Sequence, residues 1–433
     1  MPVQSDIEQA TISKVTWRLI PFLLLLYFIA YLDRVNVGFA ALQMNEDLGF
    51  SASVYGLGAG VFFAGYALCE VPSNLILARV GARRWIARIM FTWGLISISM
   101  IFTRGPLSFY TLRFLLGVAE AGFLPGIIYY LADWYPAKQR AQAVGWFMSA
   151  IPLSIIIGGP IAGLLLGLDN LLGLRGWQWL FLLEGVPAVI LSIVTLFYLT
   201  DHPDHAHWLS PEQQQWLNAK INAEQSQARE RYGIGLGRML LHPTVWLLAL
   251  LALACQSGSY GLSLWIPQIV KNLSGLSDFM VGMITALPYC AAAIGMVLVG
   301  AHSDRTGERF LHIAVPSLLA VFGFCLSAWL TSPLPAIIAL TIAAVGDLSS
   351  RGPFWALPGR FLSGSASAGG IALINTIGSL GGFVGPFAVG WIKDRTGDYS
   401  DGLLFLASLL FIGAVLTLYL RRVPILTDNG TES

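Results

Sequence analysis

Long runs of apolar residues alternate with short polar segments along almost the whole chain. A helix needs about 20 mostly apolar residues to cross the hydrocarbon core of a bilayer. Twelve runs are of about that length, at residues 16–40, 54–78, 85–103, 107–131, 141–168, 177–199, 241–270, 280–301, 311–331, 334–357, 365–392 and 402–420. A membrane β-barrel would show alternating segments of about ten residues, whereas these runs are continuous. The pattern predicts an all-α integral membrane protein with twelve transmembrane helices.

One polar segment, residues 200–240, is much longer than the others and separates the first six predicted spans from the last six. We therefore expect an N-terminal six-helix bundle over 1–199, a linker over 200–240 and a C-terminal six-helix bundle over 241–433. Within the linker, residues 211–227 are expected to form an amphipathic surface helix that begins at Ser210 as its N-cap. The linker is expected to be solvated and to carry no site.

Composition agrees with a chain embedded in lipid. Hydrophobic residues make up 56% and charged residues 11%, with a mean hydropathy of +0.68, whereas soluble chains average about 25% charged residues. These values exclude disorder, a collagen-like chain, a disulfide scaffold and a nucleic-acid binder. The net charge of +1 points to no partner. The first apolar run is too long for a signal peptide and ends without a small-residue cleavage site.

Basic residues predict the orientation of the chain. An even number of spans places both termini on one side, and thirteen basic residues lie on that side outside the linker, against five on the other. The thirteen are Lys14, Arg18, Arg79, Arg83, Arg84, Arg88, Lys138, Arg140, Arg305, Arg309, Arg360, Arg421 and Arg422. The five are Arg104, Arg175, Lys271, Lys393 and Arg395. Because cytoplasmic loops carry the excess of Lys and Arg, both termini and the linker are predicted to be cytoplasmic.

Two loops indicate an internal repeat. The segment 79–83 (RVGAR) joins the second and third spans, and 305–309 (RTGER) joins the eighth and ninth, at an offset of 226 residues. The pairs Gly-Pro at 159–160 and at 385–386 have the same offset. Two matches in one register indicate duplication. Parallel six-helix repeats place a substrate site near the midplane, between halves that rock around it.

The basic loops are candidates for conformational latches, because Arg and Lys can pair with helix C-termini and acidic neighbours. The alternative is that they only set topology. Ala78 stands where the second copy has Asp304, so we expect the first latch to be the weaker. The candidate latch residues are Arg79, Arg83, Asp304, Arg305 and Arg309.

No enzyme chemistry, cofactor or metal site is predicted. The glycine-rich segment 56–60 lies within a hydrophobic run, where small residues favour close helix packing, and it lacks the strand that a nucleotide-binding loop requires. His202, His205 and His207 lie in a polar loop without a nearby cysteine. We also find no motif of a known catalytic class.

The informative residues are the charges inside the predicted spans. Each costs roughly 2.5–3.5 kcal/mol on insertion scales, so a functional role is the default hypothesis. Arg113 and Glu120 are seven residues apart and share a helix face. Asp347 and Arg351 are four apart and can pair. The full set is Asp33, Arg34, Glu70, Arg113, Glu120, Glu184, Asp347 and Arg351, of which Glu70 and Glu184 lie nearer span ends, where a structural role is favoured.

Buried arginines predict that an anion is bound. Guanidinium groups bind carboxylates through two parallel hydrogen bonds, and a carboxylate in a low-dielectric site can take up and release a proton. We therefore predict substrate contacts at Arg34 and Arg113, with proton coupling at Asp33 and Glu120. Fixed ion pairs that hold helices together are the alternative, and for Asp347 and Arg351 both readings stand equally. Further candidate substrate contacts in the second half are Tyr260, Arg351, Trp355 and Asn375.

Several phrases carry a family resemblance that covers essentially the whole chain. They are 31–36 (YLDRVN), 70–74 (EVPSN), 113–122 (RFLLGVAEAG), 177–181 (WQWLF), 354–358 (FWALP) and 375–378 (NTIG). The sequence resembles the major facilitator superfamily, and within it the anion:cation symporter family. It looks closest to bacterial members that import tartrate-like or aromatic carboxylates.

This resemblance implies proton symport of a small organic carboxylate, such as a sugar acid, through alternating access by a functional monomer in the bacterial inner membrane. It implies that Arg34 and Arg113 bind the substrate carboxylate, that Asp33 and Glu120 are tied to protons, and that Tyr66 lines the cavity. Two alternatives remain open. One is an anion exchanger or facilitator that works without protons, and the other is a membrane receptor that does not transport.

Overall fold

A computed structural model describes residues 2–231, 242–358 and 365–423, and in these residues every regular element of secondary structure is a helix. Twelve helical segments are long and apolar enough to cross a membrane, which confirms the predicted number of spans. The described part of the first half holds α1 (Pro2–Asp47), α2 (Ala52–Val80), α3 (Ala82–Ser99), η1 (Met100–Phe102), α4 (Pro106–Glu120), α5 (Phe123–Ala132), α6 (Ala137–Met148), α7 (Ala150–Leu166), η2 (Leu171–Gly173) and α8 (Gly176–Tyr198). The remainder holds η3 (Pro203–His205), α9 (Pro211–Arg231), α11 (Pro243–Ser274), α12 (Asp278–Thr306), α13 (Leu311–Trp329), α14 (Pro333–Ser349), α15 (Arg351–Ala356), α17 (Ser365–Thr396) and α18 (Ser400–Leu420).

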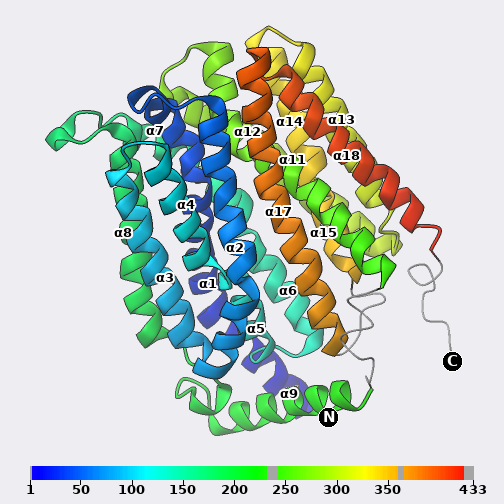
Figure 1. The fold of residues 1–433 in the computed structure, drawn as a ribbon. Coiled ribbons are helices and arrows are strands. Elements are labelled where there is room, and N and C mark those ends of the chain that lie inside the picture. Colours follow the sequence, from blue (N-terminus) through cyan, green and yellow to red (C-terminus); the bar gives the residue numbers. More distant parts are fainter. Residues whose placement is uncertain (1, 232–241, 359–364, 424–433) are drawn as a thin grey trace.

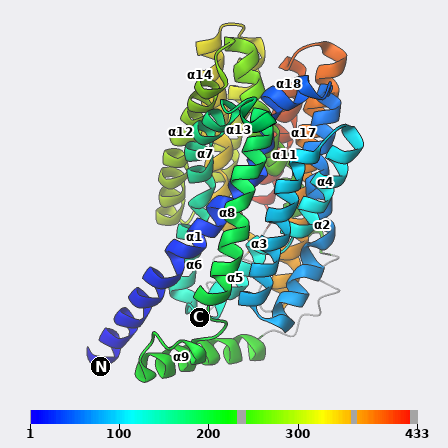
Figure 2. The ribbon, with the colours of Figure 1, turned by 90° about the vertical axis from the view of Figure 1, so that its left-hand side faces the viewer.

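The spanning helices run in roughly one direction and form two groups that lie side by side (Figure 1). The first six spans, blue to green, make one group, and the last six, green to red, make the other. Helix α9 lies across the end of the bundle at which α1 begins, as both views show (Figures 1 and 2). The boundary expected at 240/241 falls outside the described residues, so the proposed division of the chain rests on the linker pattern.

The predicted linker helix is present as α9. Ser210 Oγ accepts a hydrogen bond from the Gln213 backbone N at 3.3 Å, and Gln213 Oε1 accepts one from the Ser210 N at 3.1 Å. This reciprocal arrangement is a capping box. Leu217 and Ile221 are buried on the inner face of the helix. The predicted helix and its N-cap are confirmed.

Three spans predicted as continuous consist of two helices each, and in one of them, 141–168, α6 and α7 separate at Ser149. The run 107–131 consists of α4 and α5, because Gly122 adopts φ +86°, a left-handed conformation that stops an α-helix. The run 334–357 is divided into α14 and α15 at Ser350, which keeps right-handed helical backbone angles of φ −73° and ψ −19°. The Ser350 hydroxyl donates to the Asp347 carbonyl at 2.8 Å, in local competition with helix hydrogen bonds. Hydropathy measures the length of an apolar run and gives no sign of such divisions within it.

Helices from the two halves approach closely through glycine. A Cβ built on Gly282 of α12 would lie 2.2 Å from the Gly159 carbonyl oxygen of α7, and one on Gly56 of α2 would lie 2.6 Å from the Pro386 oxygen of α17. Such distances exclude any side chain unless the backbones separate. For Gly56 this agrees with the close helix packing predicted for segment 56–60, whereas the sequence did not single out Gly282.

Replacement of Gly282 by alanine is expected to force α7 and α12 apart, at a cost of about 1–3 kcal/mol to the state seen here. Thermal unfolding of the purified protein in detergent measures the loss. Gly300→Ala is the matched control on the same helix, because nothing lies within 4 Å of a Cβ there. Equal unfolding temperatures for the two variants would contradict the close approach.

Polar contacts also join the two halves at the end of the bundle opposite α9. The Asp394 carboxylate of α17 accepts hydrogen bonds from the backbone N atoms of Ala52 and Ser53 at 3.0 and 2.7 Å, and so caps α2. The Gln43 amide of α1 donates to Asp278 Oδ2 of α12 at 2.9 Å. The halves are therefore closed against each other at this end.

Candidate functional site

A buried ion pair joins the first and fourth spans. Arg34 Nη2 of α1 pairs with Glu120 Oε1 at the last residue of α4, and the two residues are 6% and 1% exposed. Arg34 Nη1 donates a hydrogen bond to the Tyr260 hydroxyl of α11 at 3.1 Å. Tyr260 lies 226 residues after Arg34, so it occupies the equivalent position of the second repeat. One guanidinium group thus links a carboxylate of its own half to a hydroxyl of the other.

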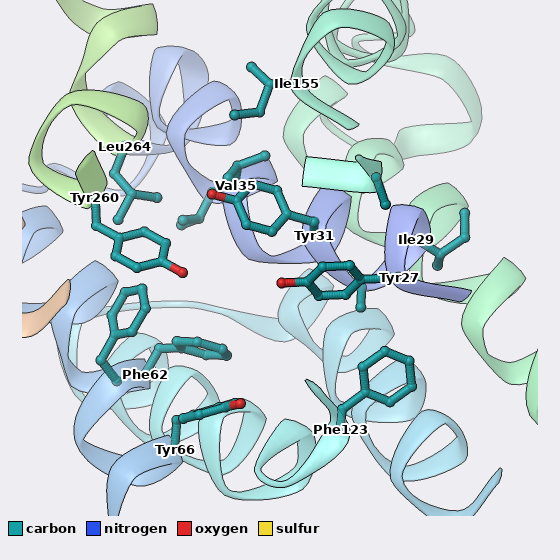
Figure 3. Packing of buried hydrophobic residues seen from close by; sticks show 14 of the residues in the cluster. Tyr27, Ile29, Tyr31, Val35, Phe62, Tyr66, Phe123, Ile155, Tyr260 and Leu264 are labelled. Atoms are coloured by element: carbon teal, nitrogen blue, oxygen red, sulfur yellow. The ribbon is translucent and has the colours of Figure 1, made fainter. Parts of the chain in front are cut away.

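Aromatic rings surround this pair. The Arg34 guanidinium carbon lies 5.2 Å from the Tyr66 ring centre and 5.5 Å from that of Phe62, which places the cation against their π faces. Figure 3 shows the hydroxyl groups of Tyr27, Tyr66 and Tyr260 directed toward a common space between α1, α2 and α11. Tyr66, predicted to line the cavity, is therefore next to Arg34.

Asp33 lies beside Arg34 in sequence but contacts different neighbours. Its carboxylate accepts hydrogen bonds from Trp93 Nε1 at 2.9 Å and Ser97 Oγ at 2.8 Å, both on α3, and from Asn36 Nδ2 at 3.3 Å. Adjacent helix residues point about 100° apart, which accounts for the separate environments. In the described part of the chain Asp33 has neutral donors and no ion pair.

Arg113 is fully buried and contacts the backbone of α2. Its Nε and Nη2 atoms donate to the carbonyl oxygens of Gly58 and Ala59 at 3.3 and 3.4 Å, and its guanidinium carbon lies 4.9 Å from the Phe62 ring centre. Nη1 has no hydrogen-bond partner among the described residues. Phe62 therefore contacts both arginines. Although Arg113 and Glu120 belong to one helix face, the structure pairs Glu120 with Arg34.

A second polar contact crosses between the halves at Glu70. This buried carboxylate of α2 accepts a hydrogen bond from Asn375 Nδ2 of α17 and another from Thr376 Oγ1 at 3.2 Å. Asn375, a candidate substrate contact, is thus placed against Glu70. The sequence favoured a structural role for Glu70 because of its position near a span end, and it carried no sign of this partner.

Asp347 and Arg351 form the pair that their spacing predicts, at 3.9 Å between Oδ2 and Nη2. This separation exceeds a hydrogen bond. Trp355, on the next turn, lines a small cavity together with Arg351, Ser350, Gln256 and Cys255. Glu184, the remaining charge inside a span, is buried near Asp33.

The predicted latch loops make different contacts. In the second half, Arg309 Nη1 pairs with Asp304 Oδ1 at 2.6 Å. In the first half Arg83 pairs with Asp201, with Nε to Oδ2 at 3.7 Å, while its backbone N donates to Oδ1 at 2.8 Å. Asp201, from the start of the linker, thus supplies the acidic partner that Ala78 lacks. Arg79 and Arg305 are exposed.

Glu308, in the loop before α13, stabilises the start of that helix. Partial burial raises the pKa of its carboxyl, but hydrogen bonds from the Leu311 backbone N at 2.8 and 3.0 Å and a contact with His312 at 3.0 Å outweigh this and hold the pKa below its usual range. Because the folded-state pKa is depressed, the stabilisation is complete above the unfolded-state value and is lost as the pH falls through the folded-state value.

Glu308→Gln is accordingly expected to destabilise the protein by about 0.5–1 kcal/mol at pH 7. The difference from the parent protein is expected to vanish at a pH below the folded-state pKa. Thermal unfolding at both pH values measures the effect. A constant difference between the two pH values would contradict an ionised cap.

Several residues of the site are not among those predicted from the sequence. Tyr27 and Tyr31 precede Arg34 at helical spacing, so their position on its face was detectable. The partners Phe62, Trp93 and Asp201 come from other helices or the linker, and no spacing relates them to the charges. Among the residues that the structure describes, no group of three or more His, Cys, Asp or Glu side chains is placed to hold a metal ion.

Comparison with known proteins gives consistent results along the chain. A relative from Agrobacterium vitis, named "Putative tartrate transporter", is 54% identical over 97% of this chain and 93% of its own length. A quinolone resistance transporter from Acinetobacter baumannii is 46% identical over 95% of each chain. Among solved structures, a bacterial homologue of the human lysosomal transporter Spinster aligns with a TM-score of 0.76 at 18% identity, over 93% of this chain and 96% of that one.

The xylose transporter XylE from E. coli shares the same fold, with a TM-score of 0.72 at 14% identity over 94% of this chain and 99% of that one. The family model described as Major Facilitator Superfamily matches residues 23–386. This match spans the ion pairs of both halves and most of the membrane helices. The chain is a multi-pass membrane protein that belongs to the major facilitator superfamily.

Proposed function

We propose that the protein imports a small organic carboxylate by proton symport through alternating access. The observation that carries the proposal is the buried Arg34–Glu120 pair, which lies at the contact between the two halves. A guanidinium group that already binds a carboxylate has the chemistry to bind a substrate carboxylate in its place. The name of the Agrobacterium vitis relative supports a hydroxy-acid substrate.

The balance of charge inside the membrane supports coupling to protons. Among the charged residues that lie inside the spans and away from their cytoplasmic ends, five are carboxylates and three are arginines. The carboxylates are Asp33, Glu70, Glu120, Glu184 and Asp347, and the arginines are Arg34, Arg113 and Arg351. If all were ionised, the interior would be negative, and an anion would be repelled from a site of low dielectric. Binding of an anion therefore calls for protons on some of these carboxylates.

The geometry supports Glu120 as the carboxylate whose protonation matters most. While Glu120 is ionised, Arg34 is engaged by it. A proton on Glu120 removes that charge, and Arg34 becomes free to bind the substrate carboxylate beside Tyr260. Arg113 adds positive charge from the same helix, and Asp33 is a second proton site within its cluster of neutral donors.

Transport then requires the two halves to move around the occupied site. The Asp394 cap on α2 and the close approach of α7 to α12 hold one end closed, and both must separate when that end opens. On the predicted orientation, this end faces the periplasm of the bacterial inner membrane, and the termini and the Arg83–Asp201 contact face the cytoplasm. We propose that a monomer suffices, because each half supplies residues to the same site.

Uptake into proteoliposomes with an imposed pH gradient tests this function. Labelled tartrate, a sugar acid and a benzoate are supplied at the outside, with the interior alkaline. Symport predicts accumulation above the external concentration for at least one substrate, and an ionophore that collapses the gradient abolishes it. Equilibration that ignores the gradient would favour the proton-independent exchanger or facilitator, and binding without uptake would favour a receptor.

A further inference from the structure

Helices α2 and α17, one from each half, lie against each other along much of their length (Figure 1). Their contacts follow a single antiparallel register, in which each step toward the α9 end along α2 is matched by an earlier residue of α17. Three successive contacts join Ala52 to Asp394, Gly60 to Phe383 and Glu70 to Asn375. The two halves are therefore in contact at several levels of the membrane.

The first and last of these contacts are polar and have the same form. In each, one carboxylate accepts hydrogen bonds from two neutral donors of the other half. Asp394 accepts from two backbone N atoms at the start of α2, at 3.0 and 2.7 Å. Glu70 accepts from Asn375 Nδ2 and from Thr376 Oγ1, the latter at 3.2 Å. The two contacts are 18 residues apart on α2, which is roughly 27 Å along a helix.

The proposed substrate site lies between these two contacts. The ring of Tyr66 faces Arg34, with 5.2 Å between its centre and the guanidinium carbon. Glu70 is four residues further along α2, so it lies on the same helix face and one turn nearer the α9 end. This end is cytoplasmic on the predicted orientation. A substrate that leaves Arg34 toward the cytoplasm therefore meets the level of Glu70 next.

The chemistry of the Glu70 contact allows it to open and close. Glu70 is 4% exposed, and its hydrogen-bond donors among the described residues are neutral groups of the other half. A buried carboxylate without donors is costly, so these two donors stabilise the closed arrangement. When the helices part, water can take the place of the donors. Asp33, by contrast, accepts from residues of its own half, so movement between the halves leaves its donors in place.

We propose that Glu70, Asn375 and Thr376 form the inner gate of the substrate site, and that their contact breaks when the site opens to the cytoplasm. Asn375 then serves the gate and not the substrate, and Glu70 positions α17 against α2 while substrate is bound. The Asp394 contact is the counterpart at the outer end. This inference rests on the proposed function and adds to it the residues that close its cytoplasmic side.

A cross-link one turn beyond the inner gate tests this proposal and leaves its three residues unchanged. Asn74, which is half-buried, and Ile371, which is exposed, are the next facing positions of the register. The double variant Asn74→Cys with Ile371→Cys is treated in proteoliposomes with a short, reducible reagent that joins two thiols. Each single cysteine variant with the same treatment is a control. The native cysteines are first replaced by serine, at Cys69, Cys255, Cys290 and Cys325.

Uptake is measured with whichever of labelled tartrate, the sugar acid and the benzoate the parent protein takes up. The cross-link is expected to lower uptake at least about 10-fold, because the gating movement is blocked, and a reductant is expected to restore it. The rise in unfolding temperature that the same carboxylate produces is expected to persist, since the site stays closed around it. Uptake that continues at the uncross-linked rate would overturn the proposal.

The rate of cross-linking tests the gate residues without transport. Asn375→Ala with Thr376→Val removes both donors, so the gate is open for more of the time, and the cysteine pair is expected to react at least about fivefold more slowly. Thr341→Val is the control, because that hydroxyl donates to the Ile337 carbonyl of its own helix. An unchanged rate in the double variant would overturn the proposal. Should that variant fail to fold, the uptake experiment decides alone. If the parent takes up no carboxylate but the rate falls as expected, the proposed function fails and the gate stands.

Discussion

Glu120→Gln is expected to abolish proton-driven accumulation of substrate while exchange of labelled for unlabelled substrate continues. Glutamine is neutral, as the protonated acid is, and it leaves Arg34 free to bind a substrate carboxylate. The variant therefore stays in a form that resembles the protein with Glu120 protonated, and it has no proton to release at this position. Accumulation driven by a pH gradient is expected to fall at least about 10-fold, and exchange to stay within about threefold.

Proteoliposomes that hold the parent protein, Glu120→Gln or Glu212→Gln provide the measurement. Glu212 lies on α9 and serves as the control for loss of a carboxylate outside the membrane. Both assays use the same preparation, so a folding defect would reduce them together. Equal loss of accumulation and exchange in a correctly folded Glu120→Gln protein would contradict a role of Glu120 in proton coupling. The Arg34–Glu120 pair would then be a structural contact.

Arg34→Gln is expected to have the largest effect on both binding and stability. It removes the substrate-binding guanidinium and leaves the ionised Glu120 without its counter-charge. Removal of one partner from a buried ion pair costs about 3–5 kcal/mol. Unfolding temperature in detergent and the shift produced by added carboxylate measure the two effects separately.

The double variant Arg34→Gln with Glu120→Gln separates folding from binding. Because no charge is left alone, its stability is expected to recover most of the loss. Its carboxylate binding is expected to remain absent. Recovery of binding together with stability would show that Arg34 serves the fold and not the substrate.

The sequence predicts where the spans lie, because a helix that crosses lipid must be long and apolar. It also predicts which charged residues are buried, because a charge inside a span is costly and therefore rare. Helix geometry indicates that Asp33 and Arg34, as adjacent residues, contact different neighbours, but it does not identify those neighbours. The partner of Glu120 was not predictable either, since both Arg34 and Arg113 were available to it. That choice depends on how α1, α2 and α4 pack, and Arg113 is taken up by carbonyl oxygens of α2.

Contacts between distant segments account for the remaining differences. The position of Glu70 near a span end favours a structural role, yet packing of α17 against α2 brings Asn375 and Thr376 to it. Asp201 pairs with Arg83 because the chain turns back under α3 after α8. None of these relations has a fixed spacing in the sequence.

Proton movement that accompanies substrate entry tests the central claim most directly. A pH-sensitive dye is trapped inside proteoliposomes that carry the parent protein, with equal pH on both sides and the membrane potential clamped, and substrate is then added outside. Symport predicts that the interior acidifies as labelled substrate enters, and that Glu120→Gln shows no acidification. Entry of labelled substrate into vesicles of the parent protein at unchanged internal pH would contradict the account.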